Sequence, residues 1–309
     1  MTQSNAGTAK INPRSSGFIN NEVYRKHTSE RSLADEAGEL QRCMQLGVAT
    51  ENVSPIRLVD FDSATNTLTT ERVHGDELFH TLWNATYLLG RLRGHRLNDP
   101  QTIFSRVGEL GQWLALYHRT SASHNADNSK AAWLLHATER KIRDIRQAKL
   151  RPERLLNKIE TRCLPGLEKL NTQTFLTDNG AFVCRVHGDF IVYNVLIDQN
   201  RQLHVVDFGD TRVSGNYEDV ARMYSSLYAI ADTNRTRRRR LGHLPSVFLN
   251  GYGLSMQATE TPYFKCNMAY NYLTHLEGQH YMRDLLSWNS NIEMSQITRA
   301  GMRWIKRQL

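Results

Sequence analysis

The chain has 309 residues, of which 40% are hydrophobic and 23% are charged, a balance typical of a folded protein with a full-sized core. Lysine and arginine number 39 against 31 acidic residues, and the net charge of +8 admits an anionic ligand, a nucleic acid or an acidic membrane surface as a partner. The four cysteines are widely spaced without a CxxC pair, which speaks against a disulfide framework and against a zinc site.

The N-terminal residues MTQSNAGTAK do not have the apolar core of a secretory signal. No later segment approaches the roughly 18 consecutive apolar residues that a membrane-spanning helix needs. Together with the cysteine usage, these features predict a cytoplasmic protein.

The first 75 residues predict a small lobe of strands with one helix. The segment FINNEVYRKH has the alternation of a strand and contains Lys26, and ERSLADEAGELQRCMQLGV then changes to helical spacing, with Gly47 as its stop. Two short strands are expected on either side of the turn-rich residues 62–66. We place the boundary at Gly75, which gives an N-lobe of residues 1–75 and a C-lobe of residues 76–309.

The C-lobe is predicted to be mainly helical. Helical spacing runs from Asp76 to about Ala122 and continues in the basic segment 126–171. Three short strands, AFVCRV, NVLID and LHVVDF, interrupt this pattern, and the last two are joined as a hairpin. Helical spacing returns at Glu218 and dominates the rest of the chain. The predicted fold class is therefore α+β and bilobal, with a small, truncated β-rich N-lobe and a large helical C-lobe.

The segment RVHGDFIVYNVLID carries polar groups at fixed offsets within an apolar stretch. His187, Asp189 and Asn194 lie in it, and Asp207-Phe208-Gly209 follows thirteen residues after the asparagine. Phosphoryl transfer requires a carboxylate that accepts the proton of the attacking hydroxyl, and Asp189 is placed for this role. Mg²⁺ prefers oxygen ligands, which Asn194 and Asp207 supply at the two ends of the predicted hairpin. We expect His187 to be a buried hydrogen-bonding support of the loop.

A kinase also needs a cation for the phosphates of the nucleotide. The segment Val23-Tyr24-Arg25-Lys26 is similar to the strand that ends in the phosphate-binding lysine of kinases. Glu36 on the following helix is the expected ion-pair partner of Lys26, and Glu39, one turn further along, is the competing partner.

With these motifs the chain resembles the aminoglycoside phosphotransferase and choline kinase group, which are small-molecule kinases with a protein-kinase-like fold. The segments LGQWLALYH, EDVARM and FLNGY are also similar to scaffold segments of that group, and Asp219 in EDVARM is expected to cap a helix or brace the catalytic loop. The resemblance implies Asp189 as the catalytic base and Asn194 and Asp207 as Mg²⁺ ligands. It further implies Lys26 as the phosphate-binding lysine with Glu36 as its partner, and TERVHG, around Glu71 and Val73, as the hinge that meets adenine.

Two departures from the kinase pattern are informative. No GxGxxG motif is present, so NPRSSGF is the candidate nucleotide-covering segment, in which Ser15, Ser16 and the amide of Gly17 would reach phosphate. Gly188 stands where protein kinases have the arginine of their HRD motif, and the helix containing Asp219 begins about nine residues after Gly209. This leaves no room for an activation loop, so a protein substrate is not expected.

The most direct interpretation is an ATP-dependent phosphotransferase, with GTP as the other candidate nucleotide, that uses Mg²⁺ and acts on a hydroxyl of an aminoglycoside-, sugar- or amino-alcohol-like molecule. Carboxylates would meet a cationic acceptor. The candidates are Asp210, Glu218, Glu260 and Glu277.

Two alternatives remain open. The run Arg235-Thr236-Arg237-Arg238-Arg239-Arg240 attracts phosphates and anionic lipids, so the acceptor could be an anionic sugar or a lipopolysaccharide core, with Arg237–Arg240 in peripheral contact with a membrane. The other alternative is a catalytically idle kinase fold that binds nucleotide or nucleic acid. The intact Asp189, Asn194 and Asp207 argue against it, and the arginine run does not have the interleaved aromatic residues of nucleic-acid modules. Nucleic acid is therefore not an expected partner.

Overall fold

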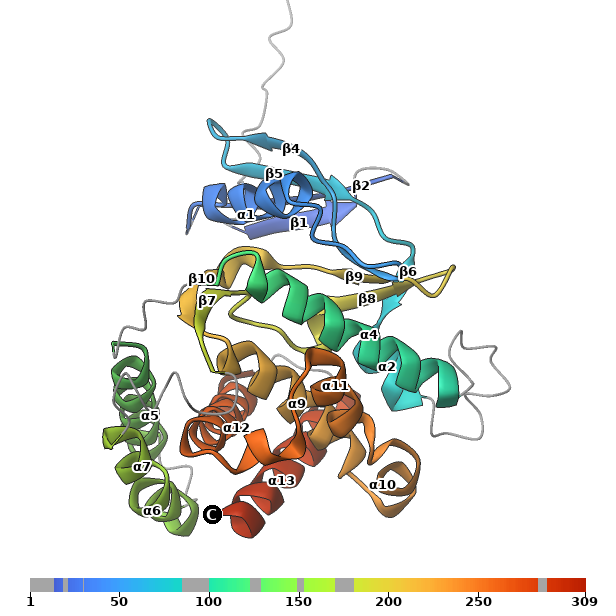
Figure 1. Cartoon of the computed structure of the whole chain (residues 1–309). Coiled ribbons are helices and arrows are strands. Elements are labelled where there is room, and N and C mark those ends of the chain that lie inside the picture. The colour runs from blue at the N-terminus through green and yellow to red at the C-terminus, as the bar shows by residue number, and fades with distance from the viewer. Residues whose placement is uncertain are drawn as a thin grey trace, which may run out of the picture.

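The computed structural model describes residues 14–18, 22–29, 31–84, 100–122, 129–148, 153–169, 181–282 and 288–309. A sheet-rich part built from the N-terminal elements lies above a larger helical part (Figure 1). This arrangement confirms the predicted fold class. Among the described residues, no helix combines the length and the apolar character needed to cross a membrane.

The upper part is a four-stranded antiparallel sheet in the order β1-β2-β5-β4, with helix α1 beside it (Figure 1). Its elements are β1 (Arg14–Phe18), β2 (Val23–Thr28), α1 (Ala34–Gln45), β4 (Leu58–Asp62) and β5 (Thr67–Glu71). The predicted turn between β4 and β5 is present. The Asp62 carboxylate accepts a bond from the amide of Ala64 at 2.9 Å, and Asn66 closes the turn with φ of 48°. The predicted helix stop is also confirmed, since Gly47 follows α1 with φ of 60°.

A second four-stranded sheet, in the order β3-β9-β8-β6, joins segments that are far apart in the chain. It contains β3 (Val53–Pro55), β6 (Gly75–Glu77), β8 (Val195–Asp198) and β9 (Leu203–Val205). The predicted hairpin of β8 and β9 is confirmed, and β3 pairs with β9 in parallel. A strand from the first 75 residues thus belongs to the sheet of the expected catalytic hairpin, and the division into two lobes at Gly75 stays a prediction.

The helix predicted from Asp76 was wrong at its start. Residues Gly75–Glu77 form β6, which pairs with β8, and the helix α2 begins only at Leu78. A Cβ on Gly75 would lie 2.0 Å from the carbonyl oxygen of Ile197, so this strand packs closer to β8 than another residue type allows. The tertiary pairing therefore overrides the local helical spacing. The part of the predicted helix in residues 85–99 lies outside the described residues.

The lower part consists of helices around the two-stranded antiparallel sheet of β7 and β10 (Figure 1). Its elements are α2 (Leu78–Asn84), α4 (Pro100–Arg119), α5 (Ser129–Gln147), α6 (Glu153–Arg162), α7 (Leu164–Glu168), β7 (Val183–Val186), η1 (Val192–Asn194), η2 (Phe208–Asp210), β10 (Arg212–Gly215), α9 (Tyr217–Ala231), α10 (Arg235–Leu241), α11 (Leu244–Tyr252), η3 (Met256–Glu260), α12 (Pro262–Met282) and α13 (Trp288–Gln308).

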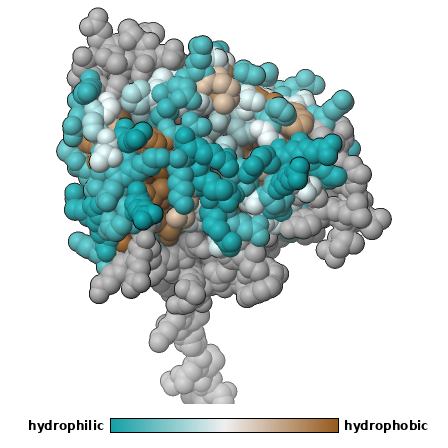
Figure 2. All heavy atoms as spheres, turned by 90° about the horizontal axis from the view of Figure 1, so that it is seen from below, coloured by the Kyte–Doolittle hydropathy of each residue, from teal (hydrophilic) through white to brown (hydrophobic). Residues whose placement is uncertain are grey.

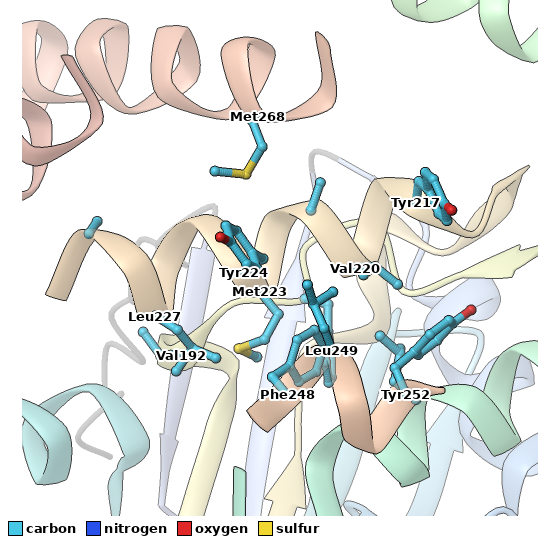
Figure 3. Packing of buried hydrophobic residues seen from close by; sticks show 14 of the residues in the cluster. Val192, Tyr217, Val220, Met223, Tyr224, Leu227, Phe248, Leu249, Tyr252 and Met268 are labelled. Atoms are coloured by element: carbon cyan, nitrogen blue, oxygen red, sulfur yellow. The ribbon is translucent and has the colours of Figure 1, made fainter. Parts of the chain in front are cut away.

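Helix α9 runs through the middle of the hydrophobic core. Its Val220 and Met223 are completely buried, and they lie with Phe248 of α11 and Met268 of α12 in the cluster that Figure 3 shows. Burial of side chains of this size stabilises the fold by roughly 1.5–3 kcal/mol each. Because α9 is packed against α11 and α12, its backbone is held in place. The polar side chains that it directs toward the expected catalytic loop therefore start from a fixed position.

A buried carboxylate connects α1 with the lower part. Glu39 is only 2% exposed, and its Oε1 accepts a bond from the Tyr117 hydroxyl of α4 at 2.9 Å. Its Oε2 accepts a bond from Arg185 of β7 at 2.7 Å, and Arg42 of α1 itself donates to Oε1. Burial alone would raise the pKa of Glu39, but the bonds from Arg42 and Tyr117 and the charge of Arg185 hold it below its ordinary value.

The Glu39→Gln variant should therefore lose stability in a pH-dependent way. At pH 7 we expect a loss of roughly 1–3 kcal/mol, because the partly exposed Arg42 and Arg185 lose the counter-charge of the buried carboxylate. Since the pKa of Glu39 is lower in the folded than in the unfolded protein, its contribution is complete above the unfolded value and disappears as the pH falls through the folded value. Chemical denaturation at pH 7 and at about pH 3 measures this. A difference between wild type and variant that stays constant in acid would contradict the assignment.

The arginine run forms α10 and is not a uniform basic surface. Arg237 is 1% exposed, its guanidinium lies 3.5 Å from the centre of the Trp83 ring, and it donates to the Trp83 carbonyl at 3.0 Å. Arg238 is paired with Asp232 at 2.6 Å. Arg239 and Arg240 are exposed, and the described residues on the underside, seen in Figure 2, are largely hydrophilic. The expectation of a membrane contact through all of Arg237–Arg240 is therefore wrong for Arg237.

Two arginine substitutions in α10 should differ sharply in their effect. The Arg237→Gln variant should lose roughly 2–4 kcal/mol of stability, because it removes the cation from the Trp83 ring and its bonds in the interior. Arg239→Gln changes an exposed side chain and should stay within about 0.5 kcal/mol of wild type. Urea denaturation of both variants measures this, and equal stabilities would show that the burial of Arg237 has no energetic weight.

Candidate active site

The structure brings Asp189 and Asn194 together on the loop after β7. The Asn194 side-chain nitrogen donates to the Asp189 carbonyl at 2.8 Å and to its Oδ2 at 3.0 Å. The 3-10 turn η1 makes this possible, because it returns the chain toward Asp189 before β8 begins. The two residues that the motif predicted as base and metal ligand are thus in contact.

A buried aspartate braces this loop, as expected from EDVARM. The Asp219 carboxylate accepts bonds from the amides of His187 at 2.6 Å and Gly188 at 2.9 Å, and it lies 3.0 Å from His118 Nε2. Burial would raise the pKa of Asp219, but the bond and charge of His118 and the bonded His187 amide hold it below its ordinary value. The His187 ring lies 3.0 Å from the Val206 carbonyl, so it supports the strand that leads to Asp207.

Gly188 has a structural reason to stand where protein kinases have arginine. Its φ is +84°, and an added Cβ would lie 2.2 Å from the Asp210 carbonyl oxygen. A side chain at this position would therefore be strained by the backbone and blocked by η2.

The Gly188→Ala variant should be at least about 2 kcal/mol less stable than wild type and lose most of its activity, because the loop must move to admit a methyl group. Gly38→Ala is the matched control. Gly38 is exposed within α1 with no atom near its Cβ position, so alanine there should be neutral or slightly stabilising. Denaturation and phosphotransfer assays of both variants test this, and a fully stable and active Gly188→Ala protein would contradict the close approach to Asp210.

Lys26 of β2 contacts the Asp207-Phe208-Gly209 motif and so joins the two lobes. Its Nζ lies 2.9 Å from Glu36 Oε2 and 2.8 Å from Asp207 Oδ1. Glu36, and not the competing Glu39, is therefore the partner of Lys26 from α1. Asp207 occupies the left-handed region with φ of 62° and ψ of 63°, a conformation that costs a non-glycine residue about 1–2 kcal/mol. The fold holds this strained residue facing the lysine.

The ion pairs shift the pKa values of their members in different directions. Burial would lower the pKa of Lys26, but the charges of Glu36 and Asp207 raise it above its ordinary value. Burial would raise the pKa of Asp207, but the charge and bond of Lys26 hold it low. For Glu36 the effect of burial is the larger one, and its pKa is raised. Lys26 and Asp207 are therefore both charged at neutral pH.

The donor atoms near Asp207 fit a hard divalent cation. The Asn194 amide directs its nitrogen to Asp189, which leaves its oxygen for another partner, and Asp207 is an ionised carboxylate. Within the described ranges, no three His, Cys, Asp or Glu side chains gather as metal ligands. Mg²⁺ at this place would take two protein ligands and complete its shell with phosphate and water, as it does in nucleotide sites.

A cavity of about 440 Å³ is lined by residues of both four-stranded sheets and by Lys26 and Asp207. Its lining also includes Glu71 and Val73 of the predicted hinge. The aliphatic lining residues are Ile56, Leu68, Val73, Leu196 and Val206. The Glu71 carboxylate accepts a bond from the Arg57 amide at 2.9 Å, and the amides of Glu71 and Arg72 donate to backbone carbonyls. The backbone at Val73 is therefore what the hinge can offer to a ligand. An apolar cavity that also has charged lining residues suits a purine nucleotide.

The predicted nucleotide-covering segment is the strand β1. Ser15, Ser16 and Gly17 pair with His27, Lys26 and Arg25 of β2, so Ser16 lies directly opposite the lysine. Residues 19–21, between the two strands, lie outside the described residues. The contact of residues 15–17 with phosphate stays a prediction.

Two arginines at the site were missed in the sequence. Arg31 donates to the Gly209 carbonyl at 3.1 Å, and its Nη2 lies 3.9 Å from Asp207 Oδ1, so it adds a second cation beside Lys26. Arg222 of α9 lies with its Nη2 2.9 Å from Asp189 Oδ1. One signal was available for Arg222, because it follows Asp219 by three residues and so shares its helix face. Arg31 has no comparable signal in the sequence.

Each carboxylate proposed for a cationic acceptor already has a basic partner. Asp210 lies 3.6 Å from Arg31, and Glu260 lies 2.7 Å from Lys265. Glu218 is buried and paired with Arg212, and Glu277 is paired with Lys141. Of these four, none faces the site as an uncompensated charge.

The two-part fold, the Asp189–Asn194 loop and the Lys26–Glu36–Asp207 cluster define the class of phosphotransferases with a kinase-like fold. The model of the phosphotransferase enzyme family matches residues 10–251, and the chain belongs to this family. It is a phosphotransferase that acts on a hydroxyl of a small molecule. The resemblance seen in the sequence is thereby confirmed.

Solved structures of the same fold cover nearly the whole chain at low sequence identity. A glucosamine kinase has 14% identity and a TM-score of 0.60, with 98% of this chain and 79% of that chain covered. The GDP complex of an aminoglycoside 2′-phosphotransferase-IIIa has 14% identity and a TM-score of 0.54, covering 94% and 89% of the two chains. Choline kinase LicA from Streptococcus pneumoniae has 13% identity and a TM-score of 0.50, covering 96% and 91%. A sequence comparison with curated proteins finds no match.

Proposed function

We propose that the chain transfers the γ-phosphoryl group of ATP or GTP to a hydroxyl of a sugar-, amino-alcohol- or aminoglycoside-like acceptor in a Mg²⁺-dependent reaction. The observation that carries the proposal is the pair of motifs joined by the hairpin of β8 and β9. Asp189 is held by Asn194 before the hairpin. Asp207, after the hairpin, is paired with Lys26, and both of these residues line the cavity. Similar structures of a glucosamine kinase, an aminoglycoside phosphotransferase and a choline kinase support an acceptor of this kind.

The proposed roles follow from the chemistry of each side chain. Asp189 accepts the proton of the attacking hydroxyl, and Asn194 fixes the direction of its carboxylate through the bond to Oδ2. Lys26 binds the phosphates, and Glu36 keeps its ammonium group in the cleft. Asn194 and Asp207 hold Mg²⁺, which neutralises charge on the phosphates. The backbone from Glu71 to Val73 meets the base, and residues 15–17 cover the phosphates.

A nucleotide-consumption screen tests the proposal. Purified protein is incubated with MgATP or MgGTP and a panel of sugars, amino sugars, amino alcohols and aminoglycosides, and diphosphate release and phosphorylated product are measured. We expect one acceptor class to stimulate release and gain one phosphoryl group, with no stimulation in the Asp189→Asn variant. Nucleotide binding without transfer to any panel member would instead favour the idle kinase fold.

A further inference from the structure

The side chain nearest to the Asp189 carboxylate from α9 is a cation. Arg222 Nη2 lies 2.9 Å from Asp189 Oδ1, and the two side chains are 18% and 25% exposed, so both are partly accessible to solvent. Neighbouring Val220 and Met223 are completely buried, which fixes the helix from which Arg222 projects. A guanidinium has five N–H donors, more than one carboxylate can accept. Arg222 thus has donors to offer beside the group expected to take the acceptor's proton.

An uncharged imidazole lies close to the same pair. His275 of α12 is near enough to Arg222 and Asp189 for the charges of both to affect it. Burial, followed by the charge of Arg222, lowers the pKa of His275 to about 4 although Asp189 opposes this. The imidazole is neutral at pH 7 and does not add a positive charge. The cation that an acceptor meets here is the guanidinium of Arg222.

The carboxylates considered for a cationic acceptor do not make this region negative. A polycationic acceptor needs negative side chains that are not already neutralised. Asp210, Glu218, Glu260 and Glu277 each have a basic partner, and the pair of Asp189 and Arg222 carries no net charge. An ammonium group beside Arg222 would be repelled, whereas a carboxylate or phosphate would form charge-assisted, bidentate bonds with it.

We propose that Arg222 binds an anionic group of the acceptor, so that the substrate is a hydroxylated carboxylate or phosphate ester and not a polycation. The inference rests on the proposed function and narrows its acceptor class. Asp189 lies 2.9 Å from Arg222. Binding of the acceptor's anionic group by Arg222 would therefore direct a neighbouring hydroxyl of the acceptor toward Asp189. Arg222 is then a specificity-determining residue, and its contact with Asp189 also positions that carboxylate.

Sets of related acceptors that carry an amine, no charge or a carboxylate test the proposal. We would measure kcat and KM with MgATP for three sets, each with an amine, a neutral and a carboxylate member: glucosamine, glucose and glucuronate; 3-amino-1,2-propanediol, glycerol and glycerate; ethanolamine, ethylene glycol and glycolate. Wild type, Arg222→Gln, Arg222→Lys and the exposed control Arg239→Gln are compared, and thermal denaturation confirms that each variant is folded. Isothermal calorimetry of the MgADP complex measures acceptor binding independently of turnover.

With the wild-type protein, we expect that in the set that reacts fastest the carboxylate member has the highest kcat/KM. Arg222→Gln should raise its KM roughly 10- to 100-fold, as loss of a charge-assisted contact does, with little change for the neutral member. Arg222→Lys should keep part of the preference, and Arg239→Gln all of it.

Several outcomes would overturn the proposal. The first is a preference of the wild-type protein for an amine member. The second is an equal fall of kcat for all members in Arg222→Gln, which would indicate a purely positioning role. The third is failure of every carboxylate member to bind or react. Transfer to an amine or neutral acceptor that depends on Asp189 would leave the proposed function standing in each of these cases.

Discussion

Asp189→Asn should leave the fold intact and reduce phosphoryl transfer by roughly 10²–10⁴-fold, the contribution typical of a positioned general base. The amide matches the carboxylate in size but does not accept the hydroxyl proton at neutral pH. The carboxylate is 25% exposed and its partner Arg222 is 18% exposed, so loss of their ion pair should cost on the order of 1 kcal/mol, which the fold can tolerate. Steady-state kinetics with the acceptor found in the screen, together with calorimetry of MgATP binding, measures both effects.

Asp35→Asn is the matched control, because Asp35 is exposed in the first turn of α1 and undergoes the same change of charge and shape. It should keep wild-type turnover. If Asp189→Asn transferred phosphate as fast as this control, another group would have to accept the proton and the assignment of Asp189 would be lost.

Asp207→Asn should separate the role of charge from that of backbone shape. Asparagine tolerates the left-handed conformation of this position nearly as well as aspartate, so the fold should be retained. The variant loses the negative charge proposed to hold Mg²⁺ and the ion pair with Lys26 at 2.8 Å. We expect turnover to fall by on the order of 10³-fold, and Mg²⁺ to lose its strengthening effect on nucleotide binding.

Calorimetric titration of ATP with and without Mg²⁺ provides the measurement, and the exposed change Asp35→Asn again serves as control. A variant whose ATP affinity still rises with Mg²⁺ as in wild type would exclude Asp207 as a major ligand. The comparison also reports on Lys26, since a lysine released from Asp207 remains paired only with Glu36 at 2.9 Å and should still bind free ATP.

The parts of the site that the sequence predicts are those linked by short stretches of chain. Asp189 and Asn194 are five residues apart on one loop, and a single hairpin separates Asn194 from Asp207. Strand pairing then leaves few ways to arrange them. Lys26 and Glu36 lie on consecutive elements, so their pairing at 2.9 Å also follows from local order. The pattern of polar residues in an apolar segment carries this information.

The parts that it does not predict depend on contacts between distant segments. Arg222 reaches Asp189 only because α9 crosses behind the loop, and Arg237 is buried only because Trp83 of α2 lies over it. In both cases the sequence carries no sign of burial, because arginine is a residue type usually found at the surface. Strand β6 shows the same limit for the backbone. Its spacing is helical, and its pairing with β8 is decided by residues about 120 positions away, as Asp76 pairs with Ile197.

The fastening of α1 through Glu39 has a consequence for regulation. Many kinases are held inactive by swinging the equivalent helix outward, which removes the glutamate from the lysine. Here the bonds that Tyr117 and Arg185 donate to Glu39 tie that helix to the opposite lobe, and its outward swing would break both. The contact therefore opposes this form of inactivation and keeps Glu36 beside Lys26 at 2.9 Å.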